Sequence, residues 1–195
     1  MIRAAYQLPT TSPGAILREE KKSGTALGVE AETLTKQGKL VPDAMVNRLV
    51  DTWLGPGRAE FVFDGYPRSL GQATALDEML ARRGTPLEAV LSLEVDEATI
   101  RDRVERRLMC SRCGNIVSLG LHIASKDAAC PKCGGPLVKR GDDTAETLEL
   151  RMQEYAEKTE PLISYYTSQG LLRPVDATRT PDAVFQSVKA ILENA

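Results

Sequence analysis

The sequence predicts an α/β fold, a three-layer arrangement of helices around a parallel sheet. Short apolar runs typical of buried strands alternate with segments of helical periodicity that have recognisable helix starts. The chain has 195 residues, of which 42% are hydrophobic and 27% charged, so it is long enough to bury a core. We therefore expect one domain that carries small insertions.

Three apolar runs are the predicted strands. They are short and bounded by turn residues, as expected for buried parallel strands. They lie at Glu60–Phe63, Ala89–Leu93 and Leu171–Val175.

Three helices follow from capping residues that stand before periodic segments. They are predicted at 70–83 after Ser69, at 97–108 after Asp96, and at 182–192 after Thr180-Pro181.

Two segments interrupt this alternation. Residues 12–41 predict two short helices, the first opened by Ser12-Pro13 and closed near Gly24, the second opened by Thr25 and closed near Gly38. Residues 106–143 show no helical periodicity and contain the cysteines and several glycines. The rest of the chain, 1–11, 42–105 and 144–195, is the predicted core.

Four cysteines form two Cys-x2-Cys pairs, Cys110 with Cys113 and Cys130 with Cys133, separated by sixteen residues. This spacing predicts a tetrahedral thiolate site for zinc, although such a site also accepts iron. Two disulfides or four free thiols are the alternatives. The segment is poor in large apolar groups, so the metal would supply its folding energy, on the order of 10 kcal/mol.

The segment Asp64-Gly65-Tyr66-Pro67-Arg68 follows a predicted strand, at the sheet edge where ligands of α/β proteins bind. Gly65 permits close backbone approach, Pro67 stiffens the turn, and Arg68 offers a planar fork suited to a phosphate. The segment is a candidate phosphate site.

Together with the cysteine unit, this segment resembles the adenylate kinase family, and the resemblance extends from Ser12 to the C-terminus. It implies that the segment binds AMP and that Gln72 reads the adenine. Ser12–Arg18 is similar to the family's Ser-Thr-Gly-Asp-Met-Leu-Arg, which gives Arg18 the AMP phosphate, although Pro13 and Ala15 depart from it. The implied AMP-binding residues are Arg18, Lys39, Leu40, Val41, Gly65, Tyr66, Pro67, Arg68, Gln72, Arg140 and Arg151.

Arginines supply most of the implied catalytic machinery, because phosphoryl transfer depends on alignment and on charge stabilisation. Arg103 and Arg107 are four apart on a predicted helix and would share one face. Arg140 lies in a stretch similar to the family's Arg-x-Asp-Asp hinge, and Arg151 lies downstream. Asp64 is expected to orient magnesium-bound water. In the same stretch, Asp143 and Glu146 predict a capping box.

The implied donor site combines Arg103 and Arg107 with Ile116, Val117 and Arg179. Ile116 and Val117 stand where the family usually has an aromatic residue, and Ala177 stands where the family usually has a glycine. Residues 106–143 would form a zinc-containing lid that carries Arg140, and its closure would exclude water from the reaction.

The resemblance implies reversible phosphoryl transfer between ATP and AMP to give two ADP, with Mg²⁺ accompanying ATP and Zn²⁺ structural. A formal net charge of −2 argues against nucleic-acid and membrane-surface partners. Residues Met1–Tyr6 have no signal-peptide core, and no apolar run is long enough to cross a bilayer. We expect a cytoplasmic monomer.

One family feature is missing, since no Gly-x4-Gly-Lys-Ser/Thr phosphate loop occurs in the sequence. Met1–Leu8 would match the end of the helix that follows such a loop. We therefore expect little or no activity from the chain as written.

Two alternatives stay open. Another nucleoside monophosphate kinase, of the GTP:AMP or UMP/CMP type, would share the fold, although Gln72 favours adenine. A zinc-ribbon interaction module would carry basic and aromatic groups around its cysteines, and residues 119–129 have almost none.

Overall fold

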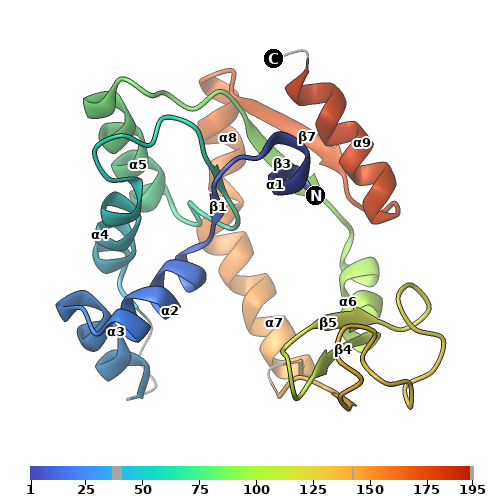
Figure 1. Ribbon diagram of the computed structural model, residues 1–195. Coiled ribbons are helices and arrows are strands. Elements are labelled where there is room, and N and C mark those ends of the chain that lie inside the picture. The colour runs from blue at the N-terminus through green and yellow to red at the C-terminus, as the bar shows by residue number, and fades with distance from the viewer. Residues whose placement is uncertain (37–40, 142, 194–195) are drawn as a thin grey trace. The chain divides into compact units, whose positions relative to one another are not determined.

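The computed structural model describes residues 1–36, 41–141 and 143–193 and shows a mixed α/β fold (Figure 1). It divides into two compact units. The first comprises Met1–Ser92, Tyr155–Arg173 and Phe185–Ala195, and the second comprises Leu93–Glu154 and Pro174–Val184. No helix in the described ranges is both long and apolar enough to span a membrane.

The first unit is largely helical. Its elements are α1 (Ile2–Tyr6), β1 (Thr10–Thr11), α2 (Pro13–Ser23), α3 (Ala26–Lys36), α4 (Asp43–Leu54), β2 (Val62–Phe63), α5 (Leu70–Arg83), the π-helix η1 (Tyr155–Thr159) and α8 (Pro161–Ser168).

Capping residues set the ends of these helices where the sequence predicts them. The Ser12 hydroxyl accepts the amide of Ala15 at 3.2 Å, and α2 closes on Gly24, whose φ is +66°. The Ser69 hydroxyl accepts the amide of Gln72 at 3.2 Å. Helix α5 spans the predicted range, 70–83. The predicted end of α3 near Gly38 lies outside the described residues.

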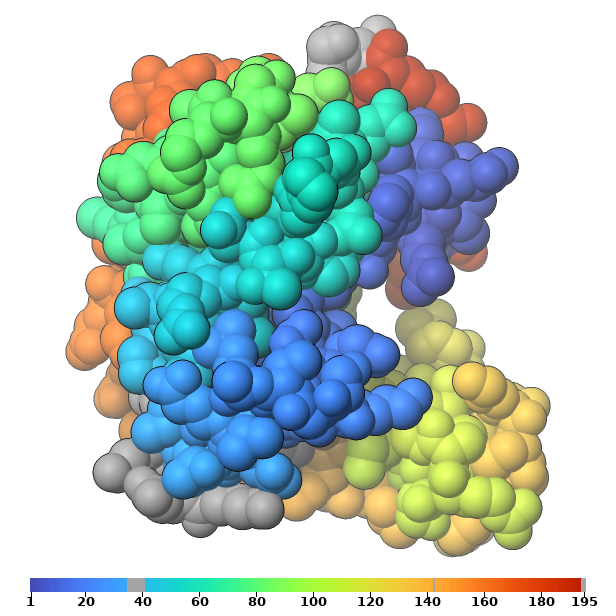
Figure 2. Space-filling view, turned by 60° about the vertical axis from the view of Figure 1, so that its left-hand side comes forward, coloured from blue at the N-terminus to red at the C-terminus, as the bar shows by residue number. Residues whose placement is uncertain are grey.

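Helix α2 packs against α3 and α4, and α4 packs against α5. Figure 2 shows α2 and α3, in blue, directly against α4, in cyan. At Gly28 an added Cβ would lie 2.4 Å from the backbone carbonyl of Glu20, so only glycine permits this approach of α3 to α2. The buried core between the helices consists of Ile16, Leu49, Val50, Leu54, Tyr66, Leu76 and Leu80.

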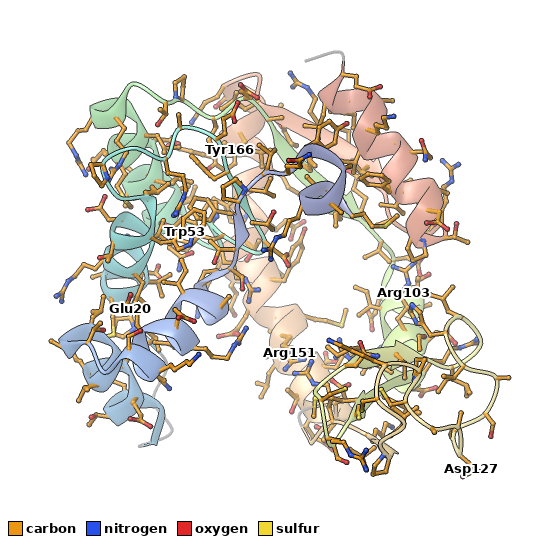
Figure 3. All side chains as sticks on the ribbon, viewed as in Figure 1. Glu20, Trp53, Arg103, Asp127, Arg151 and Tyr166 are labelled. Carbon is orange, nitrogen blue, oxygen red and sulfur yellow. The ribbon has the colours of Figure 1, made fainter. Side chains whose placement is uncertain are left out.

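Strand β2 lies against this core and pairs in parallel with β1, with Thr10 opposite Val62 and Thr11 opposite Phe63. The sequence did not predict β1. An aromatic row continues from α4 through β2: the ring centroids of Trp53 and Phe63 are 5.5 Å apart, as are those of Phe63 and Tyr66 (Trp53 is marked in Figure 3). This row supports the turn that follows β2.

Strands β3 (Val90–Glu94) and β7 (Leu172–Asp176) form a second two-stranded sheet, close to the predicted ranges. Helix α9 (Pro181–Leu192) follows β7, and Thr180 caps it by accepting the amide of Ala183. The sequence predicts a single parallel sheet. In the described part of the chain its strands form two separate pairs, β1 with β2 and β3 with β7.

The second unit contains α6 (Glu97–Glu105), α7 (Ala145–Glu154) and an antiparallel sheet in the order β5 (Ile116–Ser118), β4 (Arg107–Cys110), β6 (Leu137–Val138). The predicted helix over 97–108 was wrong at its end, because Arg107 and Leu108 belong to β4. Burial alternates along β4, with Leu108 and Cys110 inward, and pairing to two neighbours outweighs continued helix. Arg103 and Arg107 therefore do not share a helical face.

The predicted capping box at the start of α7 was also wrong. Thr144 caps this helix, since its hydroxyl accepts the amide of Thr147 at 3.1 Å. The Asp143 carboxylate instead binds Arg107.

Candidate functional site

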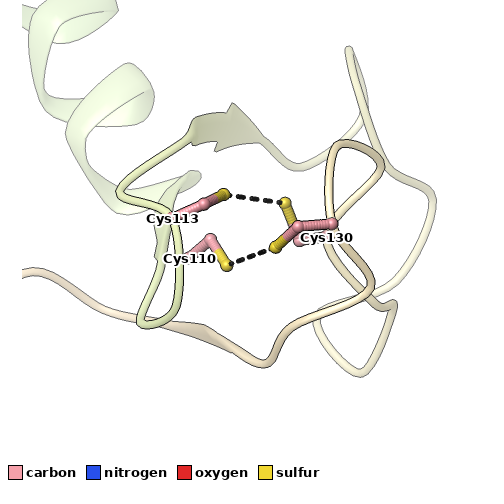
Figure 4. A group of neighbouring side chains, drawn as sticks. Cys110, Cys113 and Cys130 are labelled. Atoms are coloured by element: carbon pink, nitrogen blue, oxygen red, sulfur yellow. Dashed lines mark hydrogen bonds between the residues drawn. The ribbon is translucent and has the colours of Figure 1, made fainter.

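The four cysteines converge into one cluster in the second unit, with sulfur atoms that all lie within 4.8 Å of one another (Figure 4). The Cys110 and Cys133 sulfurs are 3.5 Å apart, and those of Cys113 and Cys130 are 3.8 Å apart. A tetrahedral site with metal–sulfur bonds of about 2.3 Å places its sulfurs roughly 3.8 Å apart. The cluster therefore fits a metal ion, and these distances are far too long for disulfides.

Two matching turns build the cluster. In each, the first cysteine's carbonyl accepts the amide of the glycine four residues on: Gly114 to Cys110 at 2.9 Å, and Gly134 to Cys130 at 2.8 Å. Both glycines have φ of +69°. At the neighbouring Gly135 an added Cβ would lie 3.0 Å from the Cys110 sulfur, so the packed thiols require a glycine there.

Backbone amides in these turns face the sulfurs. Desolvation raises the pKa of the Cys110 thiol, but the backbone N–H groups of Cys113 and Arg112 outweigh it and lower that pKa to about 6. Neighbouring Cys113 raises the pKa of the Cys133 thiol to about 12. One thiol thus retains a proton that a bound cation would displace.

The first unit places the predicted phosphate segment at the end of β2. Gly65 has φ of +68°, and an added Cβ there would lie 2.5 Å from the Arg68 guanidinium. The Arg68 Nε donates to the Gly65 carbonyl at 2.8 Å, while the side chain remains exposed. The Tyr66–Pro67 peptide bond is cis. Asp64 is also exposed, and burial raises the pKa of Tyr66, with Asp43 and Asp51 contributing.

Gln72 is the third residue of α5 and is only 7% exposed, and its side-chain amide is bonded at both ends. Its Oε1 accepts the backbone N–H of Arg68 at 2.8 Å, and its Nε2 donates to Asp43 at 2.6 Å. The structure thus brings Gln72 and Arg68 together. The role of the Asp43 side chain was not predicted from the sequence, since its partners Ser69 and Gln72 lie 26 and 29 positions away.

The other predicted residues of the first unit are Arg18 and Val41. Arg18 is exposed on α2, and Val41 is half-buried just before α4. Lys39 and Leu40, which were predicted to line the same site, lie outside the described residues.

In the second unit Arg103 holds the loop after β7. Its Nη2 donates to the carbonyls of Ala177 at 2.6 Å, Thr178 at 3.1 Å and Arg179 at 3.3 Å. Arg103 on α6 and Arg151 on α7 are marked in Figure 3. The structure thus brings two predicted donor-site residues, Arg103 and Arg179, into contact.

Arg107 binds Asp143 through Nε, at 2.8 Å, and through Nη2. The amide of Asp143 donates to the carbonyl of Arg140 at 3.1 Å, so Arg140 lies beside this pair. The two aliphatic donor-site residues differ: Ile116 is 50% exposed, whereas Val117 is buried at 2%. Of this aliphatic pair, Ile116 is the one open to a ligand.

Comparisons with known proteins all indicate the same family. A family model described as adenylate kinase matches residues 1–171. An adenylate kinase of Thermodesulfovibrio yellowstonii is 38% identical over 190 residues, which cover 96% of this chain and 88% of that protein. An adenylate kinase of Methanosarcina acetivorans is 39% identical over 96% of this chain and 87% of its own length. One from Archaeoglobus fulgidus is 40% identical over 96% and 88%.

Proposed function

This chain belongs to the adenylate kinase family, and we propose that it acts in the reversible transfer of a phosphoryl group from ATP to AMP, giving two ADP. One observation carries the proposal for the acceptor. The segment Asp64–Arg68 follows β2 and carries the exposed guanidinium of Arg68. Four residues later, the side-chain amide of Gln72 is hydrogen-bonded through both its oxygen and its nitrogen. This arrangement supports a proposed phosphate contact and a proposed base contact within one short stretch.

The acceptor residues divide by the chemistry they offer. The planar forks of Arg18 and Arg68 suit the AMP phosphate, because guanidinium groups bind phosphate oxygens at two points. Gln72 offers a donor and an acceptor side by side, as the adenine edge requires. Lys39, Leu40 and Val41, with the backbone from Gly65 to Pro67, complete the proposed pocket, and residues 12–41 form its helical insertion.

The donor residues stabilise charge that spreads over the transferring group. We assign this role to Arg103, Arg107, Arg140 and Arg151, the last two shared with AMP. Arg103 also shapes the loop that carries Arg179, where the donor base would meet Ile116. Mg²⁺ arriving with ATP would screen phosphate charge, and Asp64 would hold water of its hydration shell.

The cysteine cluster is proposed to bind Zn²⁺ as a structural ion. Four thiolates close a tetrahedral site and leave no position for a substrate. The ion would tie the two Cys-x2-Cys turns of residues 106–143 into one lid over the nucleotides. Free thiols that bind metal also fit a reducing compartment, and we propose a monomer in the cytoplasm.

Nucleotide titration by calorimetry tests the acceptor site without requiring turnover. AMP should bind the 195-residue protein more tightly than CMP or UMP. Arg68→Met should weaken AMP binding by about tenfold or more, since a hydrogen bond to a charged group contributes about 1.5–3 kcal/mol. Arg82→Met, which removes another exposed arginine of the same unit, is the control and should bind normally. Absence of AMP binding, or tighter binding of CMP or UMP, would contradict the proposal.

A coupled assay of ADP formation tests the reaction itself. The sequence contains no Gly-x4-Gly-Lys-Ser/Thr loop, so we expect little ADP, and the ADP that does form should require ATP, AMP and Mg²⁺ together. GTP in place of ATP examines the donor. Faster turnover with GTP would assign the chain to the GTP:AMP type.

A further inference from the structure

The side-chain amide of Gln72 is fixed in one orientation by two partners of opposite character. At one end a backbone N–H, that of Arg68, donates to Oε1 at 2.8 Å. At the other end the carboxylate of Asp43 accepts from Nε2 at 2.6 Å. A backbone N–H can only donate and a carboxylate can only accept. Turning the amide by 180° would set donor against donor and acceptor against acceptor.

Asp43 is itself held in place. It is the first residue of α4, and its second oxygen accepts the hydroxyl of Ser69 at 2.5 Å. That hydroxyl also caps α5 by accepting the amide of Gln72. One carboxylate thus joins the starts of two core helices and contacts the Gln72 side chain. The Asp43 carboxylate therefore has little freedom to follow a rotating amide.

An amide carries two hydrogens on nitrogen and two lone pairs on oxygen. The bonds to Asp43 and Arg68 account for one of each, so one N–H and one lone pair remain for a ligand. Adenine presents an acceptor at N1 beside a donor at the 6-amino group, which the amide complements when its Nε2 faces N1 and its Oε1 faces the 6-amino group. A 6-oxo purine in the same position presents a donor at N1 beside an acceptor at O6, so donor would meet donor and acceptor would meet acceptor.

We propose that Asp43 is a positioning residue that makes the acceptor site select a 6-amino over a 6-oxo purine, by locking the orientation of the Gln72 amide. This inference rests on the proposed function, because it requires that Gln72 face the base of the acceptor nucleotide. Asp43 acts through Gln72 and does not touch the nucleotide.

The test replaces Asp43 by a residue of the same size that can either donate or accept. In Asp43→Asn the new amide can meet either end of Gln72, while the Ser69 hydroxyl can bond either atom of the new side chain. Only the Arg68 N–H then opposes rotation of the Gln72 amide. The preference for AMP over inosine monophosphate, measured by calorimetric titration of both, should fall by about tenfold.

Asp51→Asn is the matched control. Asp51 lies on the same helix and also joins α4 to α5, through an ion pair with Arg83 at 2.6 Å. The substitution removes the same charge and weakens a link between the same helices, so it reports on stability and net charge alone. Its ratio of AMP to inosine monophosphate affinity should equal that of the wild type.

The outcomes separate the inference from the proposed function. An unchanged ratio in Asp43→Asn, in a wild-type protein that selects AMP, would overturn the inference and leave the proposed function intact. An equal fall of the ratio in Asp51→Asn would also overturn it. Failure of the wild type to bind AMP would contradict the proposed function and the inference with it. Should Asp43→Asn not fold, Asp43→Glu, which only accepts, must keep the wild-type preference.

Discussion

The guanidinium of Arg107 donates two hydrogen bonds to the carboxylate of Asp143. The Asp143 side chain is fully buried, whereas that of Arg107 is 28% exposed. This pair connects β4, the strand that carries Cys110, to the segment that leads into α7. This ion pair therefore joins the two ends of the cysteine-containing segment, residues 106–143, to each other.

We expect the two halves of this pair to differ in importance. Arg107→Met leaves a buried carboxylate without its guanidinium and should lower the free energy of unfolding by about 3 kcal/mol. Asp143→Leu leaves a cation that can still reach water, so the loss should be smaller. The double variant should recover much of the stability, since an apolar pair replaces a buried ion pair at little cost. Urea denaturation of the three variants measures this. A double variant as unstable as Arg107→Met would contradict the explanation.

Metal removal should unfold the cysteine-containing segment and leave the first unit folded. The segment has few large apolar groups to hold it without an ion, so a chelator should increase amide exchange in β4, β5 and β6. Elemental analysis should find one metal per chain, lost in Cys113→Ser and kept in Ser111→Ala, the control within the same turn. Unchanged exchange after chelation would show that the metal does not hold the fold.

Helix α5 offers a matched pair of leucines that tests the core of the first unit. Leu76 is 1% exposed and Leu70 is 45% exposed. Leu76→Ala should cost about 3 kcal/mol, because it removes buried surface and leaves a cavity. Leu70→Ala should cost less than about 1 kcal/mol. Chemical denaturation checks both values, and equal losses would contradict the assignment of the core.

Acidification should weaken the start of α6. The amide of Thr99, and then its hydroxyl, bond the Asp96 carboxylate and lower its pKa below the usual 3.8. A lowered pKa means that the folded state favours the ionised form, so this contribution is present above the usual pKa and is lost as pH falls through the folded value.

Asp96→Asn separates titration from capping. Asparagine caps a helix but does not ionise, so the variant should lose less stability than the wild type between about pH 6 and pH 3. Thermal unfolding at both pH values measures the difference. An identical loss in both proteins would exclude Asp96 as a source of the acid sensitivity.

Signals that act within a few residues were enough to determine several elements from the sequence. Ser12 and Ser69 begin α2 and α5 because a hydroxyl satisfies an amide three residues on, and Gly24 ends α2 because it adopts positive φ without strain. The Cys-x2-Cys spacing likewise indicated one cluster, since each pair closes its own turn. The α/β class followed from the alternation of apolar runs and helices.

Only the tertiary structure decided where distant partners meet. Arg107 lies in a strand and not in a helix because Ser118 of β5 pairs with it, and because β6, more than twenty-five positions away, pairs with Met109 and Cys110 of the same strand. Thr144 and not Asp143 caps α7, because the guanidinium of Arg107, 36 positions earlier, binds the Asp143 carboxylate. Asp43 contacts Gln72 and Ser69 for the same reason, since packing of α4 on α5 brings their starts together. Local sequence carries capping and turn chemistry, whereas the pairing of buried charges and amides depends on which elements pack together.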